Sequence, residues 1–392
     1  MTGGEDGSES PDEEGHSGTS DEDTRSEVDR LVEGVLAGEH RALARTITKI
    51  ENRAPGYRDL VAALHAHTGD AEVLGVTGSP GAGKSTLVDK LAKTYRDRGL
   101  TVGVIAIDPA SPFTGGAVLG DRIRMASNVG DMDVFFRSMS ARGTLGGLST
   151  ATTDAVTALD AFGKDRVIVE TVGAGQNEVD IVRTADTVAV LVPPGSGDDV
   201  QMLKAGILEI ADLFVVNKAD LAGADRTVQE LEEMLHMGGG SPTGTRDRGS
   251  AGHHGATHSV GASADEANDG DGAEADDDHE WEPRIVETVA NTGEGVDDLL
   301  AALEDHREYL VASGELDRQA RERYAAEVRT LLREDVHELL AEEIDRRGGI
   351  EAAVDRIVAR ETDPYTVADE VVAPVADCVR ERRDGERGDG RG

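Results

Sequence analysis

Seven short apolar runs recur along the chain, and glycine or polar residues bound each of them. Helix-length segments separate these runs, which cover residues 72–78, 101–108, 133–139, 166–173, 187–195, 213–220 and 284–291. Alternation of short apolar runs with helical patterns is typical of a parallel sheet with helices on both faces. The sequence therefore predicts an α/β fold with a mostly parallel sheet, in which ligands bind at the carboxyl ends of the strands.

The segment GSPGAGKST, residues 78–86, follows the first apolar run and opens a helical pattern. It fits a P-loop, in which glycines let backbone N–H groups turn inward around a phosphate chain. In such a loop Lys84 spans the β- and γ-phosphates, and the Ser85 hydroxyl ligates Mg²⁺. A chance glycine-rich turn would lack the strand before it and the helix after it. The predicted phosphate-binding residues are Gly78, Gly81, Ala82, Gly83, Lys84, Ser85 and Thr86.

The tetrapeptide NKAD, residues 217–220, suits recognition of guanine. The Asp220 carboxylate can accept hydrogen bonds from guanine N1–H and the N2 amino group, and adenine offers neither donor there. The stem of Lys218 can cover the base, Asn217 can tie its loop to the P-loop, and the Ala290 N–H can meet guanine O6. Because such a site penalises an analogue that lacks the matching groups, GTP and GDP are favoured over adenine nucleotides.

Three carboxylates are candidates for a site that holds Mg²⁺ together with Ser85. Asp108 and Glu170 end apolar runs, and Asp121 lies in a glycine-rich segment. Mg²⁺ usually keeps several waters in proteins, so Glu170 can hold the ion through one of them. The alternative for Asp108 and Asp121 is a role in capping loops.

Four further segments differ in composition from the alternating region, residues 71–313. Residues 1–25 are acidic and lack periodicity, which predicts a disordered tail. Residues 26–70 have helical spacing, and residues 314–392 predict a helical arm. Residues 238–282 are too polar to bury a core of their own, so we interpret them as a disordered insertion in a surface loop.

The formal net charge of −38 argues against nucleic-acid and anionic-membrane partners, because both would repel the chain. Only seven of the 40 basic residues are lysine, and acidic residues also crowd the folded segments. This composition favours a salt-loaded cytoplasm, where screening shortens the range of charge repulsion, over a mesophilic protein with acidic tails. Cys378 is the sole cysteine, and the sequence has neither a signal peptide pattern nor an apolar run of membrane-spanning length. A cytoplasmic protein without membrane insertion is expected.

Several longer blocks resemble one family. They are AIDPASPFTGGAVLGDRIRM, ETVGAGQNEVDI, PPGSGDDVQMLKAGILEIADLFVVNKAD, ETVANTGEGVDDL and DPYTVADEVV, in addition to the P-loop. Together they resemble the MeaB/ArgK family, which includes the methylmalonic aciduria type A protein. The resemblance spans roughly residues 28–372, and the insertion at 238–282 departs from it.

The resemblance implies a P-loop NTPase of the SIMIBI type, the class shared with signal-recognition-particle and hydrogenase-nickel GTPases. It also implies a homodimer supported by the helical arm. Its expected role is to chaperone adenosylcobalamin-dependent methylmalonyl-CoA mutase, by gating cofactor delivery and guarding against inactivated cofactor. Switch segments are expected at residues 108–124, 170–181 and 193–204.

The expected catalytic set combines the P-loop with these switches and comprises Lys84, Glu170, Gly173, Gln176 and Lys204. Glu170 is usual for this family, whereas many GTPases have aspartate. Ala174 stands where Ras-type proteins have a glutamine that orients water, and the nearest substitute is Gln176. We therefore expect slow hydrolysis alone, accelerated when a partner orders the switches and brings Arg122, Arg124 or Lys204 to the phosphate.

Two other functions compete with this interpretation. Older naming of such proteins implies an ATPase or kinase for lysine, arginine and ornithine uptake, which the guanine-reading tetrapeptide opposes. A nickel metallochaperone GTPase would explain His253, His254 and His258 within the insertion. Against this function, the chain has no cysteine near the switches. In addition, histidines in a polar linker are more often solvent-exposed spacers.

Overall fold

The computed structural model describes residues 21–109, 131–141, 147–171, 181–195, 210–238 and 280–389. The described residues up to Ser313 form one compact unit, and those from Gly314 onward form a second. Of the predicted site, Asp121, Gly173, Gln176 and Lys204 lie outside the described residues, as do most of the tail and of the insertion. The side chain of Asp108 is likewise outside them.

The first unit is built on a seven-stranded sheet with the order β3-β2-β4-β1-β5-β6-β7. Every pairing between these strands is parallel, which confirms the predicted fold class. The strands are β1 (Glu72–Gly78), β2 (Val102–Pro109), β3 (Val134–Ala141), β4 (Arg166–Thr171), β5 (Thr187–Val192), β6 (Leu213–Asn217) and β7 (Arg284–Thr288). Each begins within one residue of a predicted apolar run.

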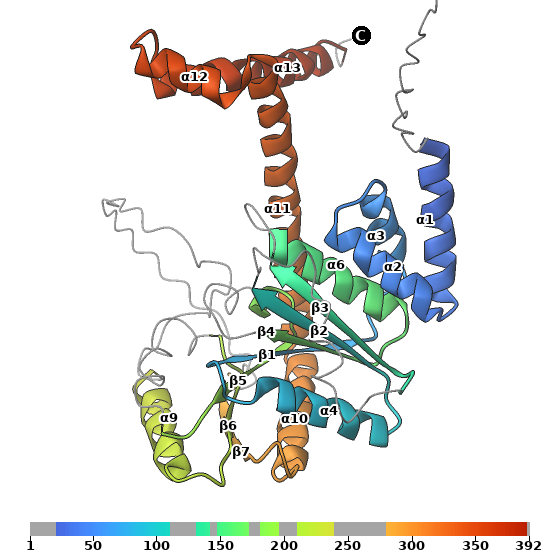
Figure 1. Ribbon diagram of the computed structural model, residues 1–392, viewed down its shortest axis with the longest axis vertical. Coiled ribbons are helices and arrows are strands. Elements are labelled where there is room, and N and C mark those ends of the chain that lie inside the picture. Colours follow the sequence, from blue (N-terminus) through green and yellow to red (C-terminus); the bar gives the residue numbers. More distant parts are fainter. Residues whose placement is uncertain are drawn as a thin grey trace, which may run out of the picture. The chain divides into compact units, whose positions relative to one another are not determined.

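Helices cover both faces of this sheet, which explains why its central strands are apolar at nearly every position (Figure 1). One core joins alternate strand residues to α4 (Lys84–Asp97) and α10 (Val296–Ala312). The opposite core includes α6 (Gly147–Ala161), the short 3₁₀ helix η2 (Ile181–Arg183) and α9 (Ala224–Gly238).

Three N-terminal helices pack together and against α6: α1 (Asp21–Leu36), α2 (His40–Glu51) and α3 (Tyr57–His65). Their buried side chains, such as Leu43 and Leu60, belong to the core on that face. Residues 21–25, predicted as tail, are helical. Three acidic side chains in the first turn of α1 favour this start, because negative charge is stabilising at a helix N-terminus.

The predicted insertion also ends earlier than expected, because residues 280–282 belong to the folded unit. The Trp281 indole N–H donates to the Asp212 carbonyl at 2.9 Å, and its ring packs against His306 and Tyr309. The indole therefore joins the segment before β7 to the segment before β6 and to α10. Composition concealed it, since a single aromatic residue follows a long polar run.

The second unit consists of three helices: α11 (Glu315–Arg346), α12 (Gly349–Val358) and α13 (Pro364–Asp389). Asp363 caps α13 by accepting hydrogen bonds from the Thr366 hydroxyl and two backbone N–H groups, which lowers the pKa of Asp363. One side of α11 exposes the apolar residues Val328, Leu332, Val336 and Leu339. Among all the described helices, none is long and apolar enough to cross a membrane.

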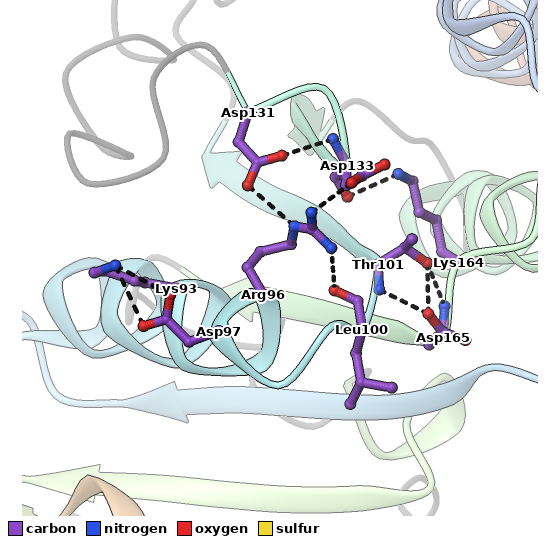
Figure 2. Close-up of polar contacts among 9 residues, drawn as sticks. All are labelled: Lys93, Arg96, Asp97, Leu100, Thr101, Asp131, Asp133, Lys164 and Asp165. Carbon is purple, nitrogen blue, oxygen red and sulfur yellow. Dashed lines mark hydrogen bonds and ion pairs between the residues drawn. The ribbon is translucent and has the colours of Figure 1, made fainter.

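A polar cluster at the amino ends of β2, β3 and β4 attaches α4 to the sheet (Figure 2). Arg96 donates to Asp131 at 3.0 Å, to Asp133, and to the Leu100 carbonyl at 2.8 Å. Lys164 donates to the Asp133 carbonyl at 2.9 Å, and burial lowers the pKa of this lysine. The Asp133 N–H keeps the pKa of Asp131 below its usual value of 3.8. Stability from ionised Asp131 is therefore present above that value and lost as the pH falls below it.

We expect the substitution Arg96→Gln to lower the free energy of unfolding by about 1–2 kcal/mol, because it removes charge-assisted hydrogen bonds at a largely buried guanidinium. Arg98→Gln is the matched control on the same helix. Its partners Asp297 and Glu304 are exposed, so it should cost less than about 1 kcal/mol. Urea unfolding of both variants measures the difference, and equal losses would contradict the anchoring role of Arg96.

Candidate nucleotide site

The predicted P-loop connects β1 to the first turn of α4, as its sequence context requires. Lys84 is buried, and its ammonium donates to the carbonyls of Gly78 at 2.7 Å and Ser79 at 3.0 Å. A lysine bound to the carbonyls of its own loop is held at the helix N-terminus, where phosphate oxygens are favoured. The structure thus positions the charge beside the loop that would cradle a phosphate chain.

Two P-loop positions allow no side chain. Gly78 has φ +130°, and a Cβ atom there would lie 2.1 Å from the Leu191 carbonyl oxygen. Gly83 has φ +93°, and a Cβ atom there would lie 2.4 Å from the Asn217 side-chain nitrogen. These glycines let the loop approach β5 and the loop after β6 more closely than any other residue would permit.

Asn217 connects the phosphate loop to the predicted guanine loops. Its side-chain amide is buried and donates to the Ala82 carbonyl at 2.8 Å. Its side-chain oxygen accepts from the Thr288 hydroxyl at 3.2 Å and from the Ala290 N–H at 3.1 Å. The loops after β1, β6 and β7 therefore meet through one side chain, which extends the predicted role of Asn217.

Lys218 and Asp220 lie on the open side of this junction. Lys218 has φ +63°, a left-handed conformation that is uncommon outside glycine, and its ammonium donates to the Gly81 carbonyl at 2.8 Å. This contact extends the lysine stem across the gap between the two loops. Asp220 is exposed, so its carboxylate is accessible to a nucleotide base.

The Ala290 N–H, which was expected to meet guanine O6, already has a partner in the structure. It donates to Asn217, so the contact with guanine O6 requires that this bond be shared or exchanged. The guanine contact of Ala290 remains a prediction. Thr288 was not singled out in the sequence, although its hydroxyl completes the same junction.

Ser85 and Glu170 face each other where the strands end. The Ser85 hydroxyl donates to a Glu170 carboxylate oxygen at 2.5 Å, and Glu170 is buried at the end of β4. A hydroxyl and a carboxylate are hard oxygen donors of the kind that Mg²⁺ prefers. Within the described residues no group of three or more His, Cys, Asp or Glu side chains could hold a metal. The pair fits an ion whose remaining positions are taken by water and phosphate oxygens.

The structure thus brings together Gly78, Gly81, Ala82, Gly83, Lys84, Ser85, Thr86, Glu170, Asn217, Lys218, Asp220 and Ala290 at loops that follow the strands. Strand β2 ends with Asp108 and Pro109 at the same edge. This arrangement can bind a nucleotide with its phosphates at α4 and its base at the loops after β6 and β7.

Comparison with protein families agrees with this geometry. A family model described as "Methylmalonyl Co-A mutase-associated GTPase MeaB" matches residues 43–345, which is most of the chain. The chain belongs to this MeaB family. The match covers the P-loop, the guanine loops and most of α11.

Relatives of this MeaB-family chain are found in archaea, bacteria and animals. A protein of Pyrococcus abyssi named as a GTPase is 44% identical over 351 residues, covering 89% of this chain and 97% of the relative. The GTPase ArgK of Escherichia coli is 34% identical and covers 79% and 85%. The methylmalonic aciduria type A homolog of Mus musculus, named as mitochondrial, is 30% identical and covers 82% and 72%.

A solved structure described as a LAO/AO transport system kinase is similar in fold. It has a TM-score of 0.60 and 24% identity, covering 90% of this chain and 98% of that chain. At this identity the similarity concerns the fold alone, including a sheet flanked by helices.

Proposed function

We propose that this chain is a GTP-binding and GTP-hydrolysing chaperone that gates adenosylcobalamin loading and protection of a methylmalonyl-CoA mutase. The observation that carries the proposal is the junction at Asn217, which joins a P-loop to a loop bearing the guanine-reading Asp220. Family membership supports the mutase as the partner, because the family is described as mutase-associated.

The residues present divide the chemistry between them. Lys84 places its charge at the β- and γ-phosphates, while Ser85 and Glu170 would hold Mg²⁺, directly and through water respectively. When bound, Mg²⁺ would neutralise charge that develops on the phosphate oxygens. Asp108 and Asp121 are proposed to contact the ion or its waters. We assign the orientation of the attacking water to Gln176, beside Gly173.

Partner gating follows from Ala174, which cannot orient water as glutamine does. Lys204 is proposed to connect the third switch to Glu170 once the mutase is docked. Hydrolysis by the free chain is then slow, and docking supplies positive charge at the transferring phosphate. Electrostatic preorganisation of this kind is usually the largest catalytic contribution.

The arm is proposed to form a homodimer. The exposed apolar residues on α11 continue along one side of the helix, and α12 exposes Ile350, Val354 and Val358. Contiguous exposed apolar surface usually marks an interface, and most soluble oligomers pair identical patches. The acidic composition supports function in a cytoplasm of high salt concentration.

Phosphate release should be measured in molar KCl with Mg²⁺, with and without an adenosylcobalamin-dependent mutase. We expect acceleration of at least ~10-fold and at most the ~10³ to 10⁵ that an added positive group contributes to phosphoryl transfer. The measurement is repeated with mutase that lacks bound cofactor. Gating of cofactor loading predicts that the two forms of the mutase stimulate phosphate release to different extents. A fast rate for the chain alone, or no acceleration by a mutase shown to bind, would contradict gating.

A further inference from the structure

Two threonine side chains form a dry hydrogen bond between the two central strands that lead to the nucleotide loops. The Thr171 hydroxyl of β4 donates to the Thr77 hydroxyl of β1 at 2.8 Å. Their exposed fractions are 1% and 0%, so water does not reach the pair. The residues lie 94 positions apart in the chain, and the bond therefore belongs to the tertiary structure.

Both threonines directly adjoin residues of the phosphate site. Thr77 precedes Gly78, whose carbonyl accepts from Lys84. Thr171 follows Glu170, whose carboxylate accepts from Ser85. The parallel register pairs Val76 with Glu170, so Thr77 and Thr171 occupy the next level toward the loops. The threonine bond therefore links these strands directly before the P-loop and at the start of the second switch.

The threonine bond and the Ser85–Glu170 bond lie on opposite faces of the sheet. Glu170 shares its face with Ile168, which packs in the core with α4. Successive side chains of a strand point to opposite faces, so Thr77 and Thr171 lie on the other face, together with Val73 and Val169 of the other core. The two strand ends are consequently held from both sides, which restricts sliding of β4 against β1.

Packing alone does not require these hydroxyls. Valine has nearly the same shape as threonine and occurs throughout β1 and β4. Replacing both partners of a buried hydrogen bond by apolar groups of the same shape can be nearly neutral for stability, whereas replacing one leaves an unsatisfied group. What valine cannot supply is a directional link between two particular strand levels.

We propose that Thr77 and Thr171 are positioning residues that set the distance between the P-loop and Glu170, and thereby the alignment of Ser85 and Glu170 toward Mg²⁺-nucleotide. This inference rests on the proposed nucleotide site. It assigns a function to two buried hydroxyl groups outside the predicted nucleotide-binding and metal-binding residues. It also explains why hydroxyl groups stand at the ends of two strands whose central residues are mostly aliphatic.

The test compares Thr77→Val, Thr171→Val, the double variant, Thr171→Ser and the control Thr46→Val. Thr46 is a fully buried threonine on α2 whose hydroxyl has no hydrogen-bond partner among the described residues. Two quantities are measured for each protein: the thermal midpoint without nucleotide, and the Mg²⁺ concentration that half-slows release of a fluorescent GDP. Neither requires hydrolysis.

The single valine variants should melt earlier than wild type, and the double variant should recover most of the loss. The Mg²⁺ midpoint of the double variant should nevertheless rise about tenfold, the scale of one lost hydrogen bond. Thr171→Ser, which keeps the hydroxyl, and Thr46→Val should stay within about twofold of wild type.

Three results would overturn the inference: a double variant with a wild-type Mg²⁺ midpoint, a serine variant shifted as far as valine, or GDP release that ignores Mg²⁺ in the wild type. GTP hydrolysis by the wild type is recorded separately. Its absence would contradict the proposed function, whereas GDP release would still decide the role of the threonine pair.

Discussion

Replacing Asp220 by asparagine is expected to weaken GTP binding at least ~100-fold and to create affinity for xanthosine triphosphate. The Asp220 carboxylate accepts from guanine N1–H and from the N2 amino group. An amide offers one acceptor and one donor, which suits the C2 carbonyl of xanthine. Because Asp220 is exposed, the substitution should leave the thermal midpoint without nucleotide unchanged.

Competition titrations with GTP, xanthosine triphosphate and ATP measure this change. The matched control is Asp225→Asn, an exposed aspartate in the first turn of α9, outside the loop that ends at Asp220. It removes the same charge and should retain the wild-type preference for GTP. Equal affinity of the wild type for ATP and GTP would refute guanine recognition by this loop.

Removing the Lys84 ammonium should weaken GTP binding by a similar factor, through lost contacts with the phosphates rather than with the base. We expect Lys84→Ala to lose at least ~100-fold in GTP affinity, about 2.7 kcal/mol, because the ammonium of this buried lysine lies at the carbonyls of Gly78 and Ser79 and would span the β- and γ-phosphates. The Lys84 ammonium donates to the carbonyls of Gly78 and Ser79, both within the P-loop segment itself. The folded circular-dichroism signal should therefore persist.

Lys93→Ala is the control for this variant, since Lys93 lies on the same helix but pairs with the exposed Asp97. Its GTP affinity should match that of wild type. If Lys84→Ala instead abolishes the folded signal, Lys84 has a structural role. If both lysine variants bind GTP equally well, the predicted role of Lys84 in binding is wrong.

The sheet was predictable because a strand buried on both faces has no polar side, and its sequence is therefore a continuous apolar run. Strands β1, β4, β5 and β6 all follow this pattern. The P-loop was predictable for a different reason. Backbone that turns tightly around phosphate requires glycine at fixed positions, and the steric contacts of Gly78 and Gly83 show that requirement directly.

Contacts between distant segments were not predictable in the same way. Arg96 and Asp133 are 37 residues apart, and Thr77 and Thr171 are 94 apart. A threonine in a strand reads simply as a β-branched residue that favours strands, so nothing local distinguishes these two. The acidic residues at the start of α1 led to the wrong prediction of a disordered tail there, because the same charges favour both a solvated tail and a helix N-terminus.

The most direct test of the account is steady-state phosphate release by the wild-type chain from GTP and from ATP, in molar KCl with saturating Mg²⁺. Phosphate release from GTP should be slow but measurable, and at least ~100-fold faster than release from ATP at equal low concentration. Chelation of Mg²⁺ should stop it. Equal rates with the two nucleotides, or undiminished release without Mg²⁺, would contradict a guanine site built from Asp220, Lys84, Ser85 and Glu170.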